Sequence, residues 1–118
     1  MRKLVLLDWE QNMMYGTVRK IGDITVPNYD QLYNFIVNTV IEDEDEWLEE
    51  MEVWINTDNE DEIKESIIEG KFESDMFLMG IGEERNIVCM TEERYDTVKH
   101  LDNDQMVDYI VNWTTEIH

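Results

Sequence analysis

The sequence has little of several residues that usually carry chemistry or cross-links. It contains one cysteine, Cys89, and two histidines, so it can form neither an internal disulfide nor a closed zinc site of nitrogen and sulfur ligands. Alanine is absent and proline occurs once. The apolar run at residues 4–7 stops at Asp8, short of the ~7–15 apolar residues of a signal peptide. No run is long enough to span a membrane, and we expect a cytoplasmic protein.

Positive charge is also scarce. Nine Lys and Arg residues stand against 29 Asp and Glu residues, which gives a formal net charge of −20 at pH 7. Such an excess disfavours direct binding to nucleic acid or anionic membranes, and it favours basic proteins or cations as partners. With 42% hydrophobic residues, four Trp and five Tyr, the chain should nevertheless pack a core. We expect a single domain, residues 1–118.

Most of the negative charge lies in one stretch, residues 42–75. It holds 16 acidic residues against Lys64 and Lys71, a net charge of −14. The same stretch also holds apolar residues, among them Trp47, Leu48, Met51, Val53, Trp54, Ile55, Ile63, Ile67 and Ile68. Because such residues pack, the neighbouring carboxylates should be held in fixed positions. A rigid field of negative charge is the one feature of the sequence that points to a function.

The strand pattern predicts a small antiparallel sheet. Strands are expected at residues 3–8, 13–21, 24–26, 74–81 and 86–91. Turns at Gln11-Asn12 and Gly22-Asp23 would make the first three an N-terminal meander, and Gly16 indicates a bulge or a close backbone approach. The last two form a hairpin.

Helices should cover this sheet. They are expected at residues 29–41, 43–50, 59–69 and 91–100 and after Asp102, with Asn28, Thr57-Asp58 and Asp102 as caps and Gly70 as a stop. The clearest periodicity is in residues 29–41. Val53-Trp54-Ile55 keeps the spacing of a helix but has the β-branched and aromatic content of a strand, and we favour a strand. The fold class is therefore α+β: an N-terminal meander and a later hairpin packed by three to five helices.

No residue set selects a reaction. Residues 56–62 begin like an EF-hand calcium loop, but the sixth position is Asp61 instead of Gly and the twelfth is Ile67 instead of Glu. Cys89 could pair with His100 as a nucleophile, yet its strand-like surroundings favour a buried, inert thiol. We expect no enzyme, no cofactor and no tight metal site. Among the aromatic residues, Trp9 and Tyr95 fit the core least well and are the expected contact residues.

The acidic stretch favours an inhibitor of a basic nucleic-acid-binding protein. In composition the chain resembles phage-encoded DNA mimics, which are small, acidic and rich in aromatic residues. The targets would be restriction or CRISPR nucleases, or nucleoid proteins, bound at their basic grooves. The alternative is an immunity protein or antitoxin that neutralises a basic nuclease toxin. The predicted contact residues are Glu42, Asp43, Glu46, Glu49, Glu50, Asp58, Glu60, Asp61, Glu62 and Glu65.

Overall fold

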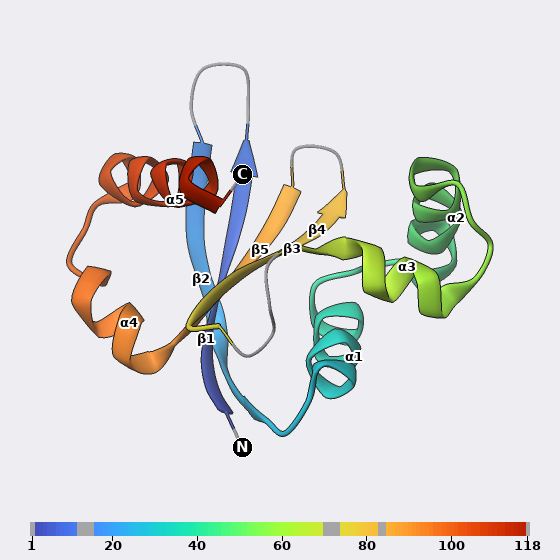
Figure 1. The fold of residues 1–118 in the computed structure, drawn as a ribbon, viewed down its shortest axis with the longest axis horizontal. Coiled ribbons are helices and arrows are strands. Elements are labelled where there is room, and N and C mark those ends of the chain that lie inside the picture. Colours follow the sequence, from blue (N-terminus) through green and yellow to red (C-terminus); the bar gives the residue numbers. More distant parts are fainter. Residues whose placement is uncertain (1, 12–15, 70–73, 83–84, 118) are drawn as a thin grey trace.

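The protein is an antiparallel sheet with helices on both faces, seen in a computed structural model (Figure 1). The structure describes residues 2–11, 16–69, 74–82 and 85–117, and of residues 2, 64–69 and 117 it describes the backbone alone. Five strands lie in the order β2-β1-β5-β4-β3. Their bounds are β1 (Arg2–Gln11), β2 (Gly16–Val26), β3 (Ile68–Glu69), β4 (Met76–Gly82) and β5 (Arg85–Thr91).

Two helical layers enclose the sheet. The first consists of α1 (Tyr29–Thr39), α2 (Glu44–Ile55) and α3 (Glu60–Ile67), and the second of α4 (Glu92–Val98) and α5 (Asn103–Ile117). Along β1, Leu4 and Leu6 pack with the first layer, whereas Val5, Leu7 and Trp9 pack with the second. Burial on both faces explains why β1 reads as a continuous apolar run instead of an alternating one. The predicted α+β fold is confirmed.

The predicted three-stranded meander is wrong in one respect, because β2 is a single strand. It runs without a turn through Gly22 and Asp23 to Val26. Its pairing with β1 shifts there: Leu6 faces Gly22 and Leu7 faces Lys20. Ile21 is thus the extra residue of a bulge, which bends a strand without ending it. A glycine and an aspartate can mark either feature in a sequence.

The helix α1 agrees with its periodicity. Asn28 caps it, and its side-chain oxygen accepts a hydrogen bond from the Gln31 backbone N–H at 3.1 Å. The residues that face the sheet are buried, namely Leu32, Tyr33, Ile36 and Val37. The helix ends at Thr39, two residues before the predicted end.

The helix α2 contradicts the strand favoured for residues 53–55, since those residues form its last turn. Helical phase places Trp47 and Met51 inward, with Ile55 partly buried. The helix stops at Asn56, whose φ of 64° lies in the left-handed region that asparagine tolerates. The packing of one continuous helical face therefore outweighs the β propensity of residues 53–55.

The remaining elements follow the prediction closely. The hairpin β4–β5 is confirmed, and α4 begins after Thr91, whose side chain caps it. Asp102 and Gln105 form the predicted capping box: the Gln105 N–H donates to Asp102 at 2.8 Å, and the Asp102 N–H donates to Gln105 at 3.2 Å. The third helix was predicted to run to residue 69, but α3 ends at Ile67 and β3 follows. Gly70 lies outside the described residues.

Candidate partner-binding surface

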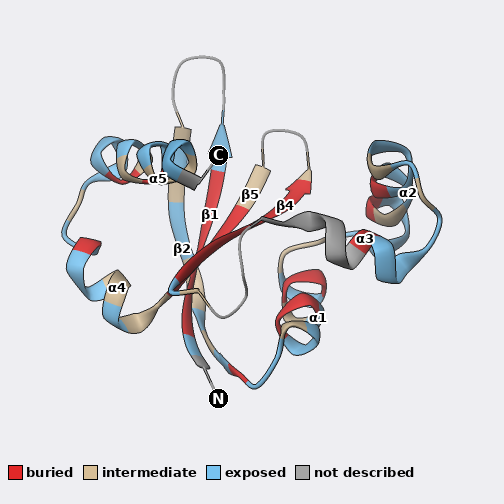
Figure 2. Cartoon of the chain, viewed as in Figure 1, coloured by how far each residue is buried: buried red, intermediate tan, exposed pale blue. Residues whose placement is uncertain are grey.

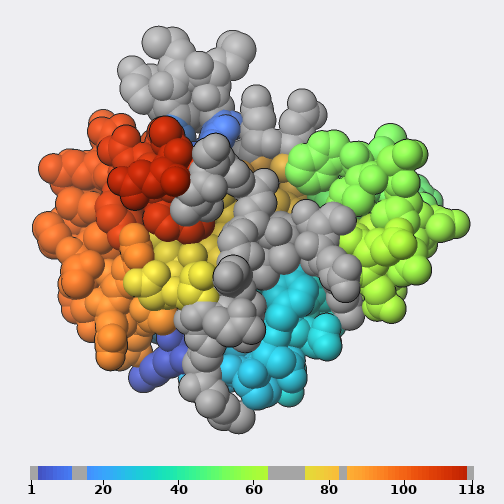
Figure 3. Space-filling model, viewed as in Figure 1, coloured from blue at the N-terminus to red at the C-terminus, as the bar shows by residue number. Residues whose placement is uncertain are grey.

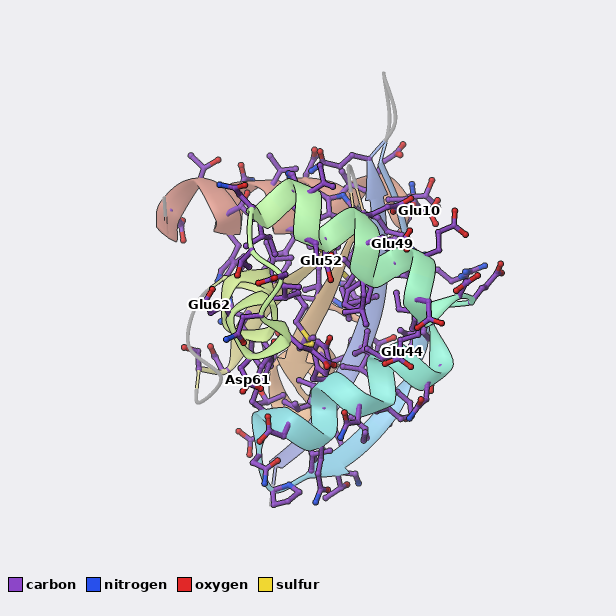
Figure 4. The ribbon with its side chains drawn as sticks, turned by 90° about the vertical axis from the view of Figure 1, so that its right-hand side faces the viewer. Glu10, Glu44, Glu49, Glu52, Asp61 and Glu62 are labelled. Carbon is purple, nitrogen blue, oxygen red and sulfur yellow. The ribbon has the colours of Figure 1, made fainter. Side chains whose placement is uncertain are left out.

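A surface of twelve exposed carboxylates covers α2, α3 and the segments beside them. We call it the acidic face. It consists of Glu42, Asp43, Glu44, Asp45, Glu46, Glu49, Glu50, Glu52, Asp58, Glu60, Asp61 and Glu62. Figure 4 looks onto this side of the molecule and labels several of these acids on α2 and α3. Residues 42–62 contain no Lys, Arg or His, so nothing in the segment itself offsets the charge.

The acidic face rests on buried apolar contacts. From α2, Trp47 and Met51 enter the core, and Ile63 does the same from α3. The Trp47 indole N–H also donates a buried hydrogen bond of 2.7 Å to the backbone oxygen of Ile81 in β4. The Trp47 ring lies 6.1 Å from that of Tyr33 in α1. In Figure 2 α2 is buried along one side and exposed along the other, so its carboxylates are carried by a packed helix.

Local hydrogen bonds fix the starts of both helices. The Asp43 carboxylate caps α2 by accepting from the Glu46 N–H at 3.1 Å. Asn59 caps α3, with its side-chain oxygen 2.9 Å from the Asp61 N. The predicted cap at Thr57-Asp58 is therefore shifted to Asn59, although the Thr57 hydroxyl does donate to Glu62 at 2.5 Å. Acids in a first helical turn are stabilised by the helix dipole, which offsets part of their mutual repulsion.

The charge of the acidic face is not compensated by ion pairs among the described side chains. Those pairs lie elsewhere: Lys3–Glu92, Arg19–Asp8, Lys20–Asp23, Arg85–Asp8, Arg85–Glu10, Arg94–Asp75 and Lys99–Asp96. Arg85 lines a groove together with four acids of the acidic face, but its ion pair, at 3.2 Å, is with the buried Asp8. The carboxylates of α2 and α3 thus point their charge at solvent.

The field also reaches the core beneath it. Tyr33 in α1 has its pKa raised to about 12, first by burial and then by the negative charges of Glu60 and Glu44. A phenolate at that position would be repelled by carboxylates from both acidic helices. Glu44 in α2 and Glu60 in α3 thus both raise the pKa of the same buried side chain.

The density of charge along α2 approaches that of a nucleic-acid strand. The helix carries six carboxylates on 12 residues. At a rise of ~1.5 Å per residue these residues span ~18 Å, or one charge for every ~3 Å of axis. One strand of duplex DNA carries one phosphate for every ~3.4 Å. The number of charges per length of axis is therefore similar in the two.

Two apolar side chains stand on this charged surface. Val53 is 84% exposed and Trp54 is 60% exposed, both on the outer side of α2. They line a groove of about 680 Å³ together with Glu49, Glu50, Met51 and Gly82. A second groove of about 540 Å³ runs past Glu42, Asp43, Glu46 and Glu50. An exposed Trp among carboxylates combines an aromatic contact with charge complementarity.

The structure describes the side chains of nine of the ten predicted contact residues. Nine of the ten are exposed and belong to the acidic face. The side chain of Glu65 is outside the described residues. Whether these acids bind a partner stays a prediction.

Of the two aromatic residues expected to contact a partner, the structure contradicts Trp9, whereas Tyr95 stays a prediction. Trp9 is 3% exposed and belongs to the core beneath α5. Tyr95 is half-buried, with the Lys20 ammonium 5.2 Å from its ring centre. The sequence analysis missed Trp54 because it placed residues 53–55 in a strand. A helix through residues 53–55 would have predicted an exposed Trp54, because Trp47, Met51 and Ile55 then fill the inner face.

The described part of the chain gives little support for metal binding or for a nucleophilic cysteine. Its His, Cys, Asp and Glu side chains form no group of three or more that could hold a metal ion. Cys89 is fully buried in β5, as expected for an inert thiol, and His100 is exposed in the turn after α4. None of the described helices has the length and apolar character required to cross a membrane.

Comparison with known proteins adds no relative. No protein-family model, no curated protein and no solved structure matches this chain significantly. A functional conclusion therefore depends on the acidic face itself.

Proposed function

We propose that the protein inhibits a nucleic-acid-binding protein by occupying its basic groove with the acidic face. One observation carries this proposal: twelve exposed carboxylates, without a cation in the same segment, stand on two helices and the residues beside them, and both helices are fixed by buried contacts. A merely soluble surface would need neither this density nor this rigidity. Self-repulsion on such a scale lowers the stability of the folded protein. A role in binding would explain why the charge is present despite this cost.

The carboxylates would take the places of phosphate groups. A groove lined with Lys and Arg attracts an acidic protein over long distances, so association is fast and falls steeply with ionic strength. A fixed array also loses little conformational entropy on binding, since its helices are already formed. The target is inhibited because the groove cannot hold this surface and nucleic acid at once.

The second candidate function is that of an immunity protein or antitoxin, and Trp54 favours it. An exposed Trp in a groove can anchor a tight complex with one cognate toxin. The two functions differ in competition. Duplex DNA should displace a DNA mimic from its target, whereas it should leave an immunity complex intact when the contact lies away from the DNA groove.

A charge-reversal variant tests the proposal. E46K/E49K/E50K changes three exposed acids of α2 and leaves Asp43, which caps the helix, in place. The matched control is E93K/D108K/E116K, which makes the same change in net charge at exposed positions of α4 and α5. The targets are a panel of restriction endonucleases, CRISPR effector nucleases and nucleoid proteins, each bound to a fluorescent DNA duplex. Displacement of the duplex is measured by anisotropy at two salt concentrations.

We expect the wild-type protein and the control variant E93K/D108K/E116K to displace DNA from at least one target, more strongly at low salt. The α2 variant should lose at least ten-fold in potency while its circular dichroism stays unchanged. Single Glu→Gln changes should have small effects, because exposed charges are individually weak. Full potency of the α2 variant would mean that the acidic face is only a solvated surface. Equal losses in both variants would assign the effect to net charge alone.

A further inference from the structure

We propose that the groove beside Trp54 receives an arginine side chain of the partner, stacked on the indole ring and paired with Glu50. This inference rests on the proposed function and assigns the anchor of the same surface. The groove is about 680 Å³ in volume and is lined by two carboxylates, Glu49 and Glu50, and by the apolar side chains of Met51, Val53 and Trp54.

The helical spacing brings ring and carboxylate together. Trp54 follows Glu50 by four residues in α2, and Val53 follows Glu49 by four. Side chains four apart on a helix are neighbours on one face, with Cβ atoms ~5–6 Å apart. The groove therefore presents two apolar side chains, each with a carboxylate one turn before it. Among the described side chains no cation pairs with Glu49 or Glu50.

Arginine fits this combination better than other side chains do. Its planar guanidinium stacks on an indole face and donates two hydrogen bonds in fixed geometry to a carboxylate, while its methylene groups cover apolar surface. Lysine offers a hydrated point charge without a stacking plane. An acidic side chain or a phosphate group would be repelled by Glu49, Glu50 and their neighbours. An uncharged apolar segment would desolvate these carboxylates without pairing them, which is costly.

Among the described side chains, one arginine lies between an aromatic residue and a carboxylate, on the opposite face of the sheet. The Arg94 guanidinium lies 5.6 Å from the ring centre of Tyr109, and its Nε donates to the Tyr109 hydroxyl at 2.7 Å. Its Nη1 donates to both carboxylate oxygens of Asp75 at 3.0 Å. Here an arginine, an aromatic ring and a carboxylate form one unit. The groove at Trp54 supplies the ring and the carboxylate and leaves the place of the arginine to another chain.

The probes are nona-arginine and nona-lysine, two peptides of equal charge. Binding is followed at ~0.15 M salt by NMR of the indole N–H groups of the four tryptophans. The Trp54 signal is assigned by its loss in W54F. We expect nona-arginine to shift the Trp54 signal more than those of the buried Trp9 and Trp47. Nona-lysine should shift it less at equal occupancy, and a larger shift with nona-lysine would contradict stacking of arginine.

Affinity separates the anchor from the general field. W54A should weaken nona-arginine binding by between about two-fold and thirty-fold, the range of cation–π contributions from exposed to desolvated sites. It should leave nona-lysine binding within about two-fold. The control V111A removes an apolar side chain that is 42% exposed on α5, and it should change neither affinity.

The outcomes distinguish this inference from the proposed function. If W54A binds nona-arginine as tightly as wild type while E46K/E49K/E50K loses binding, the anchor is wrong and the acidic face remains the site. If the triple variant also binds both peptides like wild type, the proposed function fails as well. The shift of the Trp54 signal is measured on the wild-type protein, and the variant W54F serves only to assign that signal.

Discussion

Trp47 joins the acidic face to the sheet by two kinds of contact. Its ring fills the core between α1 and α2, and its indole N–H donates to the Ile81 backbone oxygen. Ile81 is the residue that has no partner in the pairing of β4 with β5, where the register shifts between Gly80 and Gly82. The irregularity in β4 thus frees a buried carbonyl oxygen, and α2 satisfies it.

Trp47→Phe tests this contact because it keeps most of the ring and removes the N–H. We expect the free energy of unfolding to fall by about 1–3 kcal/mol, the cost of leaving a buried acceptor without its donor. Urea unfolding followed by circular dichroism measures it. Trp113→Phe, a change at a half-buried position on α5, is the control and should cost less. Equal losses would mean that ring volume, not the hydrogen bond, holds α2.

Tyr33 links stability to pH at the alkaline end. Its pKa is raised from 10.0 to about 12 in the folded protein, first by burial and then by Glu60 and Glu44. The unfolded chain therefore loses this proton before the folded one does. The contribution of Tyr33 to stability is complete below pH 10 and is lost as the pH rises from 10 to 12.

Tyr33→Phe should remove that part of the pH dependence. We expect the wild type to lose more stability than Y33F between pH 9 and pH 11.5, measured as the shift of the urea midpoint. The comparison between the two proteins matters more than either curve, because it cancels the contributions of all other groups. Parallel curves would show that folding does not raise the pKa of Tyr33.

At the scale of elements, sequence patterns predicted what local chemistry decides. The cap at Asn28, the inner face of α1 and the capping box of Asp102 and Gln105 all follow from side chains three or four apart. Position relative to a distant element was harder. Gly22 and Asp23 read as a turn, but pairing with β1 carries the strand through them.

The candidate site was predictable only in part for the same reason. The acidic residues of α2 and α3 stand out by composition, and burial of Trp47, Met51 and Ile63 turns their opposite side to solvent. Trp54 could be assigned to the surface only once the helix was known to continue. Which of two apolar neighbours faces the core depends on helical phase, and the β propensity of residues 53–55 obscured it.

Asp43 has two functions in α2, as a cap and as a charge, and two substitutions separate them. D43A removes both the carboxylate and the cap oxygen that accepts from the Glu46 N–H. D43N removes the charge and keeps an oxygen that can cap. We expect D43A to cost about 0.5–2 kcal/mol and D43N only a few tenths, because asparagine caps as well as aspartate.

Thermal unfolding followed by circular dichroism compares the two Asp43 variants. If they lose the same stability, the attraction between the charge and the helix dipole is the main contribution, and not the hydrogen bond. If D43A alone is destabilised, the start of α2 depends on the cap. D43N then removes a charge from the acidic face of an intact helix.

At the scale of the molecule, negative charge is concentrated at one end. The helices α2 and α3 form a lobe at the side of the sheet, green in the space-filling view of Figure 3. The described cations lie on β1, β2, β5, α4 and the residue after α4, where they pair with other acids: Lys3, Arg19, Lys20, Arg85, Arg94 and Lys99. The electrostatic potential is therefore strongly negative on one side of the molecule. Such a potential steers a basic partner to the acidic face.

This distribution predicts how salt affects stability. The net charge is −20, and most repulsion should arise among the carboxylates of α2 and α3, because residues three or four apart on a helix have Cβ atoms only ~5–6 Å apart. The screening length is ~30 Å at 0.01 M salt and ~3 Å at 1 M. Added sodium chloride should therefore raise the melting temperature of the wild type.

The two triple variants locate the repulsion, since each brings the formal net charge from −20 to −14. E46K/E49K/E50K should raise the melting temperature at low salt and flatten its rise with salt, because it places lysines among the remaining acids of α2. E93K/D108K/E116K should do so to a smaller extent. Differential scanning calorimetry from 0.01 to 1 M salt measures both effects. An equal flattening of the salt dependence in the two variants would mean that repulsion is spread over the whole surface. If the melting temperature of the wild type does not change with salt, the acids of α2 and α3 are paired within the molecule.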